Sequence, residues 1–310
     1  MQSIGFAAKV LALLVSFAGL CGMIRRWTKL DGTSAPLVTV SLITVVMMLG
    51  GGALYGIWWV LYLGGFLGFL WHYLIRRSKP DLTAVVTLGA ALAFVCLRFP
   101  GAYFTGNDSV SHWGLAAKFL LRENRFPDGA QELIYFPSYP LGEGVYLYYV
   151  CRSLGSRPDL YMAGLFMLYV VALLPVMGLA GEKKPLGPVL GALTMIYLLC
   201  CNTFSLSLQV DALIGYLAIG GTLIVCREHD SPRKLAALGV IAMLTLVKTS
   251  GIFYAVVLAA LLGLSSDKKT RLRSLLAGLG VAALAFALWQ LHVKLNFGAV
   301  TGKHAVSVAR

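Results

Sequence analysis

The chain has 310 residues, of which 58% are hydrophobic and only 13% are charged. An ordinary soluble domain carries about 25% charged residues, so this composition excludes a soluble globular fold and indicates a membrane-embedded chain. The net charge of +13, from 26 Lys and Arg against 13 Asp and Glu, also raises the question of nucleic-acid binding, which the positions of the basic residues decide.

Ten predominantly apolar windows follow one another along the chain, and a membrane-crossing helix needs about 20 such residues. We expect transmembrane helices at about 4–24, 36–54, 57–75, 82–98, 160–180, 186–204, 212–226, 235–250, 251–264 and 274–293. The windows 235–250 and 251–264 are short and almost contiguous, so they form either two spans or one broken or tilted pair. The predicted fold class is therefore all-α, a polytopic helical membrane protein with about ten transmembrane helices.

Basic residues gather in every second gap between these windows. Fifteen of the 26 cations lie there: Arg25, Arg26, Lys29, Arg76, Arg77, Lys79, Lys183, Lys184, Arg227, Arg233, Lys234, Lys268, Lys269, Arg271 and Arg273. The positive-inside rule makes that side cytoplasmic and places the N-terminus outside. A nucleic-acid-binding protein would need its basic residues on one soluble face. The charge therefore indicates topology in a lipid bilayer, in which the gaps face an acidic membrane surface, and argues against a nucleic-acid partner.

Between residues 99 and 159 the apolar pattern breaks for a stretch far longer than a usual connection. On the predicted topology this stretch is an outer-face loop, and long ordered loops often carry function. We divide the single transmembrane domain, residues 1–310, into four N-terminal spans (1–98), this loop (99–159), six further spans (160–294) and an outer-face tail (295–310).

The first half of the loop has the pattern of an amphipathic helix. From Val110, apolar residues recur at helical spacing, whereas Ser111, His112, Lys118, Arg122 and Glu123 take the other side. Such a stripe suits an interfacial helix with Trp113 at headgroup depth, capped by Asn107 or Asp108. A second short aromatic helix is expected from Val145 to Cys151.

Ionisable residues of the loop and of two span ends are candidates for chemistry. Asp108, four residues before His112, is a plausible general base, although an Asp at this position is more often only a helix cap. His112 by itself suits interfacial hydrogen bonding as well as catalysis. Asp211 and Lys248 end spans on the outer side, where charges are costly and functional by default; the alternative is a structural ion pair. The six cysteines show no zinc-finger spacing.

Several of these residues stand in short motifs whose order resembles a known family. The motifs are Asp108-Ser-Val-Ser-His-Trp113, Lys118, Tyr139-Pro140-x-Gly142, Val210-Asp-Ala-Leu-Ile-Gly215 and Val247-Lys-Thr-Ser-Gly-Ile-Phe253. In this order, over about 105–305, the chain resembles the polytopic glycosyltransferases of the GT-C fold, and in particular bacterial members with Asp-x-x-Ser-His-Trp in the first long outer loop.

The resemblance implies that a sugar is transferred from a polyprenyl-phosphate carrier to an acceptor on the outer face of the bacterial cytoplasmic membrane, the acceptor being a cell-envelope glycan, a lipid or a protein. It makes Asp108 catalytic, as the base that takes the proton of the acceptor hydroxyl, with His112 beside it. The leaving phosphate needs cations. The implied substrate-binding residues are Lys118, Arg122, Arg125, Tyr139, Asp211 and Lys248.

The sequence departs from the family pattern in its motifs and in its length. Ser109 follows Asp108 where relatives often carry Glu, and Leu141 stands where they carry a second Pro. The missing carboxylate weakens a site for Mg²⁺ or Mn²⁺, to which Asp211 would contribute in a metal-using variant. The chain ends at Arg310, soon after the last window, whereas the family continues, which implies a C-terminally truncated member.

Two other functional classes stay open. A transporter or flippase of lipid-linked sugars is expected to carry paired repeats and interrupted spans, whereas this sequence shows no convincing repeat and places its ionisable groups at the outer ends. An inactive paralogue or scaffold is the third reading, which the early C-terminus favours.

Overall fold

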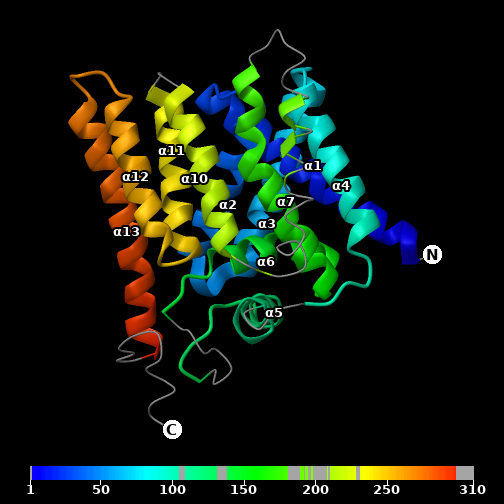
Figure 1. The fold of residues 1–310 in the computed structure, drawn as a ribbon. Coiled ribbons are helices and arrows are strands. Elements are labelled where there is room, and N and C mark those ends of the chain that lie inside the picture. The colour runs from blue at the N-terminus through cyan, green and yellow to red at the C-terminus, as the bar shows by residue number, and fades with distance from the viewer. Residues whose placement is uncertain are drawn as a thin grey trace.

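The computed structural model describes residues 2–104, 109–130, 138–180, 189–191, 193–194, 197, 208, 210–227 and 231–297. All regular secondary structure in these ranges is helical (Figure 1). The α-helices are α1 (Gln2–Thr28), α2 (Ala35–Gly50), α3 (Leu54–Phe69), α4 (Leu82–Arg98), α5 (Gly114–Glu123), α6 (Gly142–Leu154), α7 (Pro158–Met177), α10 (Val210–Arg227), α11 (Ser231–Val247), α12 (Gly251–Leu264) and α13 (Arg271–Phe297). Short π turns occur at Leu70–Ile75 and Ser109–Trp113, and 3₁₀ turns at Gly51–Ala53 and Gly178–Ala180.

Five helical stretches in the described residues are long and apolar enough to cross a membrane. They are Ile4–Thr28, Ala35–Ile75, Pro158–Met177, Val210–Arg227 and Arg271–Phe297. Three apolar helices are shorter: Leu82–Arg98, Lys234–Val247 and Gly251–Leu264. A helix thus occupies each predicted window except 186–204, most of which lies outside the described residues, and the two expected loop helices are present as α5 and α6.

The stretch Ala35–Ile75 contains 41 residues and bends in its middle. A straight helix of that length would measure about 60 Å, twice the apolar thickness of a bilayer. Gly51 has a φ of +43°, a left-handed value that glycine adopts without strain. A Cβ on Gly50 would collide with Ile57, a residue two turns away in a straight helix. The chain therefore turns at Gly51, inside the window predicted at 36–54 and shortly before the window predicted at 57–75.

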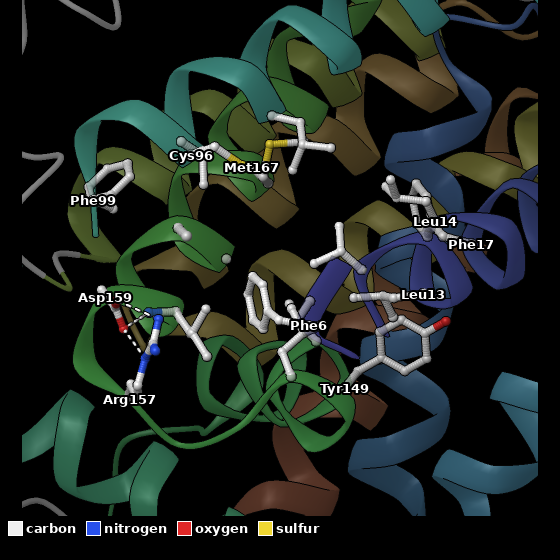
Figure 2. A pocket seen from close by; sticks show the side chains of 18 of the residues that line it. Phe6, Leu13, Leu14, Phe17, Cys96, Phe99, Tyr149, Arg157, Asp159 and Met167 are labelled. Carbon is white, nitrogen blue, oxygen red and sulfur yellow. Dashed lines mark hydrogen bonds and ion pairs between the residues drawn. The ribbon is translucent and has the colours of Figure 1, made fainter. Parts of the chain in front are cut away.

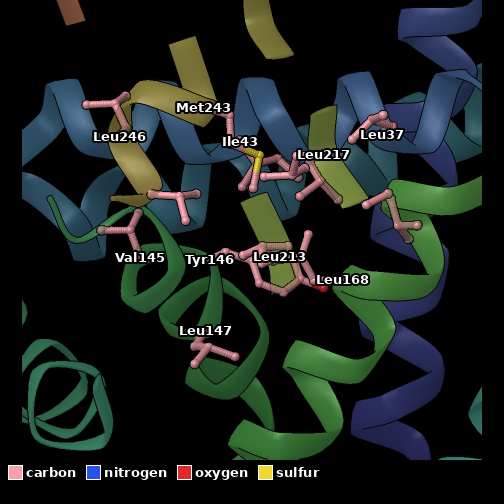
Figure 3. Packing of buried hydrophobic residues seen from close by; sticks show 14 of the residues in the cluster. Leu37, Ile43, Val145, Tyr146, Leu147, Leu168, Leu213, Leu217, Met243 and Leu246 are labelled. Carbon is pink, nitrogen blue, oxygen red and sulfur yellow. The ribbon is translucent and has the colours of Figure 1, made fainter. Parts of the chain in front are cut away.

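The core of the protein lies where α2, α6, α7, α10 and α11 meet. In Figure 3, Val145 and Tyr146 of α6 point toward Leu246 of α11 and Leu213 of α10. Val145 and Tyr146 are both buried. In Figure 1, α5 is seen end-on while the long helices run up the view, so α5 crosses one end of the bundle, next to α6. We call this end, which carries α5 and α6, the loop end.

The opposite end is formed by the basic junctions between helices. Arg227, at the end of α10, pairs with Asp31, between α1 and α2, at 3.0 Å. Arg25, at the end of α1, donates a hydrogen bond to the carbonyl of Lys79, between α3 and α4. Three of the predicted basic gaps therefore meet at one end of the bundle, and Figure 1 shows the junction of α12 and α13 at that end as well.

Small residues allow α1 and α3 to pack closely. A Cβ on Gly65 of α3 would collide with the carbonyl and the hydroxyl of Ser16 on α1, while the Ser16 hydroxyl donates to the carbonyl of Tyr62 at 2.8 Å. In a bilayer the hydrophobic effect does not drive helices together, because lipid chains are as apolar as the side chains. Close backbone packing of this kind therefore stabilises the association of α1 with α3.

We therefore expect Gly65→Ala to destabilise the protein. The added methyl forces α1 away from α3, and overpacking of this kind costs about 1–3 kcal/mol. Gly64→Ala is the matched control, because a Cβ at Gly64 meets nothing within 4 Å and alanine is the better helix former. Thermal unfolding in detergent should show a lower melting temperature for Gly65→Ala only. Equal melting temperatures of the two variants would contradict the close packing of α1 against α3.

Candidate functional site

The turn that precedes α5 places His112 inside the protein. We expected His112 on the polar face and Val110 in the apolar stripe, and both predictions are wrong: His112 is 1% exposed and Val110 is 56% exposed. The reason is the π turn Ser109–Trp113, whose wider hydrogen-bonding pattern breaks the helical period that the prediction assumed. Beyond this turn, the apolar residues at helical spacing are buried within the protein, where α5 packs on α6: Ala117, Leu120 and Leu121.

Asp108, the expected catalytic base, lies outside the described residues. Its neighbour Ser109 is buried, and the Ser109 hydroxyl accepts a hydrogen bond from the backbone N–H of Leu208 at 2.7 Å. Leu208 precedes Asp211 by three residues. The motif that begins at Asp108 is therefore attached to the chain just before α10.

The rings of His112, Trp113 and Tyr139 contact one another beside α5. The Tyr139 ring stacks on Trp113 with centroids 5.9 Å apart and an angle of 10° between the planes. The His112 ring meets both rings edge-on, at 4.5 Å from Trp113 and 5.5 Å from Tyr139. Burial, together with the charge of Lys248, lowers the pKa of His112 from 6.5 to about 4, so the imidazole is neutral at pH 7.

Asp211 and Lys248 form an ion pair next to these rings. The Lys248 Nζ donates to the Asp211 carboxylate at 2.6 Å and lies 5.9 Å from the centre of the Tyr139 ring. The Lys248 side chain is 20% exposed and that of Asp211 is 71% exposed. We call His112, Tyr139, Asp211 and Lys248 the loop-end cluster: residues from four distant sequence positions that the fold brings together.

The close approach of α6 to α11 explains this meeting. A Cβ on Gly142 would lie 2.5 Å from the carbonyl oxygen of Leu246 and 3.2 Å from the amide of Val247. Only glycine fits there, which accounts for Gly142 in the Tyr139-Pro140-x-Gly142 motif. The same contact holds the first turn of α6 against the end of α11, directly before Lys248.

Glu143 is a residue at this crossing that sequence analysis did not single out. Its side chain is 1% exposed, and neither carboxylate oxygen has a hydrogen-bond partner within the described part of the chain. Burial raises the pKa of Glu143 to about 8, so the carboxyl group keeps its proton at pH 7. The signal that could have identified it is its position between Gly142 and Gly144 in an otherwise apolar, aromatic helix.

The other predicted cations do not join the cluster. The Arg122 side chain is 86% exposed and pairs with Glu123 at 3.3 Å, and Arg125 pairs with Asp128 at 2.5 Å. The Lys118 Nζ lies 5.5 Å from the centre of the Phe104 ring. Each of the three has a partner in the loop region itself.

The described residues do not fit a divalent metal. They include no group of three or more His, Cys, Asp or Glu side chains that could hold one. The Asp211 carboxylate, the expected ligand, is already bound by the ammonium of Lys248, which a metal ion would have to displace.

Two apolar cavities lie among the helices. The α13 cavity, of about 280 Å³, lies between α2, α11 and α13 and includes Leu246, Phe126 and Trp289 among its lining residues. Trp289 Nε1 donates to the carbonyl of Ser138 at 3.0 Å, the residue before Tyr139. Leu246 also contacts Gly142, so one lining residue of this cavity belongs to the α6–α11 contact.

The α1 cavity, of about 350 Å³, lies between α1, α4, α6 and α7. Figure 2 shows the Arg157–Asp159 ion pair at one end of it, with Leu14 and Phe17 toward the other. The Asp159 carboxylate accepts from Arg157 at 2.9 Å and from the backbone N–H of Gly101 at 3.3 Å. This pair ties the start of α7 to the segment after α4.

No protein-family profile, curated protein or solved structure matches this chain.

The low pKa of His112 predicts a specific loss of stability in acid. As the pH falls from 6.5 to about 4, the unfolded chain takes up a proton at this residue and the folded protein does not, so the folded state loses about 1.4 kcal/mol per pH unit in that window. The His112→Gln variant has no titratable group at this position, so its folded state does not lose this stability. Relative to pH 7.5, thermal unfolding at pH 5 should therefore show a smaller drop in melting temperature for the variant; parallel curves would contradict the burial of a neutral imidazole.

Proposed function

We propose that the protein is a membrane glycosyltransferase that moves a sugar from a polyprenyl-phosphate carrier to an acceptor on the outer face of the bacterial cytoplasmic membrane. The observation that carries the proposal is the loop-end cluster, in which aromatic rings, a neutral imidazole and an ammonium–carboxylate pair lie together. Leu246, at the contact of α6 with α11, also lines an apolar cavity. The cluster and the cavity together provide groups that suit a sugar, a phosphate and a hydrocarbon chain. The order of the sequence motifs supports the same reading.

The proposed topology has about ten spans, with the basic junctions in the cytoplasm and the loop end outside. The meeting of the junctions through Arg227–Asp31 and Arg25–Lys79 supports this arrangement. In this topology α5 and α6 are interfacial helices at the level of the outer headgroups. The acidic inner surface of the bilayer then faces the basic end.

The proposed reaction is a direct displacement at the anomeric carbon. Asp108 takes the proton of the acceptor hydroxyl, the acceptor oxygen bonds to the anomeric carbon, and the bond from that carbon to the phosphate oxygen breaks. The polyprenyl phosphate leaves as an anion, which needs a positive charge rather than a proton. Lys248 is the cation of the cluster, and the rings of Tyr139 and Trp113 provide faces for the sugar.

The α13 cavity is the proposed place for the polyprenyl chain next to the phosphate. It is lined by apolar residues of α2, α11 and α13, with His292 and Trp289 among its few polar groups. A chain that lies there would hold its phosphate near the end of α11, where Lys248 follows Val247.

The central test is Asp108→Asn. Loss of the base should lower sugar transfer by about 10²-fold or more while the melting temperature stays the same, measured in proteoliposomes with polyprenyl-phosphate sugars and extracted acceptors. Asp128→Asn is the control, since Asp128 is a loop acid that pairs with Arg125. Full transfer by Asp108→Asn would contradict its role, and movement of the lipid-linked sugar without a glycosylated product would favour a flippase.

Filling the α13 cavity should impair use of the donor. Ala285 is 8% exposed and lines this cavity, so Ala285→Phe should raise the KM for the lipid-linked sugar about tenfold by occupying the space of the chain. Ala287→Phe is the matched control, because Ala287 is an exposed residue of the same helix that is not among the lining residues. Unchanged kinetics in Ala285→Phe would rule out this cavity as the place of the chain.

A further inference from the structure

Glu143 has no role in the reaction proposed above. It follows Gly142, the residue at which α6 contacts α11 next to the loop-end cluster. Gly142 contacts the backbone of α11 at Leu246, and Gly144, on its other side, faces α5, where a Cβ would lie 3.3 Å from Leu120. The first turn of α6, which carries Glu143, therefore lies between α11 and α5.

The described part of the chain does not satisfy this carboxyl group. Both oxygens are buried, and neither has a hydrogen-bond partner among the described residues. An apolar side chain of the same length would avoid the cost of burying a polar group without a partner. Unsatisfied buried groups in native proteins call for a specific reason, such as a role toward a ligand.

Glu143 also lies close to the loop-end cluster. Its neighbour Gly142 contacts the backbone of Leu246 and Val247, directly before Lys248. Asp211 is the partner of Lys248. Glu143 is therefore held by the same helix contact that precedes Lys248 in the chain.

We propose that Glu143 is a ligand-binding residue of this site, which in its protonated form hydrogen-bonds a hydroxyl group of the donor sugar. A protonated carboxyl group offers one donor and one acceptor, which matches a hydroxyl group, and it brings no negative charge near the carrier phosphate. The inference rests on the proposed function and adds to it the group that recognises the sugar rather than the lipid.

The test compares two variants of Glu143 in binding to polyprenyl phosphate with and without a hexose. Glu143→Gln keeps one donor and one acceptor, so it should retain the affinity for the sugar-bearing carrier within about threefold. Glu143→Met keeps the length without polar atoms, so it should bind that carrier at least about tenfold more weakly, bind the sugar-free carrier unchanged, and melt at the same or a higher temperature. Glu123→Met is the matched control, since Glu123 is an exposed acid paired with Arg122.

The outcomes separate this inference from the proposed function. A wild-type protein that binds neither carrier overturns both. A wild-type protein that prefers the sugar-bearing carrier, together with a Glu143→Met protein that keeps this preference, overturns only the assignment of Glu143. A Glu143→Met protein that melts at a much lower temperature or does not fold shows that the fold needs the carboxyl group, and this also overturns the assignment.

Discussion

The structure of the loop end depends on the close contact between the first turn of α6 and the last turn of α11. Helices of ordinary side chains stay about 8–10 Å apart, whereas Gly142 lets the α6 backbone meet the carbonyl of Leu246 directly. The chain on either side is then fixed: Tyr139 precedes the contact and Lys248 follows it. The Trp58 indole N–H, which donates to the carbonyl of Tyr149 at 3.0 Å, holds the far half of α6 to α3.

The charges of the loop end follow from what this packing leaves exposed. The Asp211 side chain is 71% exposed, and exposed ion pairs contribute only about 0–1 kcal/mol, so exchange of Asp211 for a phosphate at Lys248 costs little. His112 and Glu143 are buried and have shifted pKa values in opposite senses, which leaves both groups uncharged at pH 7. One partly exposed ion pair beside two neutral groups is an arrangement suited to an anionic ligand that carries hydroxyl groups.

Hydropathy was sufficient to predict the helices but not how they meet. The windows 82–98 and 251–264 coincide with α4 and α12, because long apolar runs leave few alternatives to a helix. The motifs also placed Tyr139, Asp211 and Lys248 on one side of the bundle, where they are found together. The face of His112 was predicted wrongly, because one π turn shifts the helical period without any compositional signal. Glu143 was overlooked because its burial arises from contacts with distant elements.

An apolar cavity affects the stability of a protein differently in a bilayer than in water. In a soluble core, an unfilled space loses dispersion contacts and lowers stability, so selection for stability fills it. A cavity that opens to lipid can be filled by a hydrocarbon chain, and the protein then loses little by keeping it. Neither cavity is therefore evidence of a function by itself. The α13 cavity is distinguished by its neighbours: Leu246 lines it and also contacts Gly142, next to the Glu143 carboxyl group, which has no hydrogen-bond partner among the described residues. Stability alone does not favour that combination, whereas a ligand with an apolar chain and a polar head would use both parts.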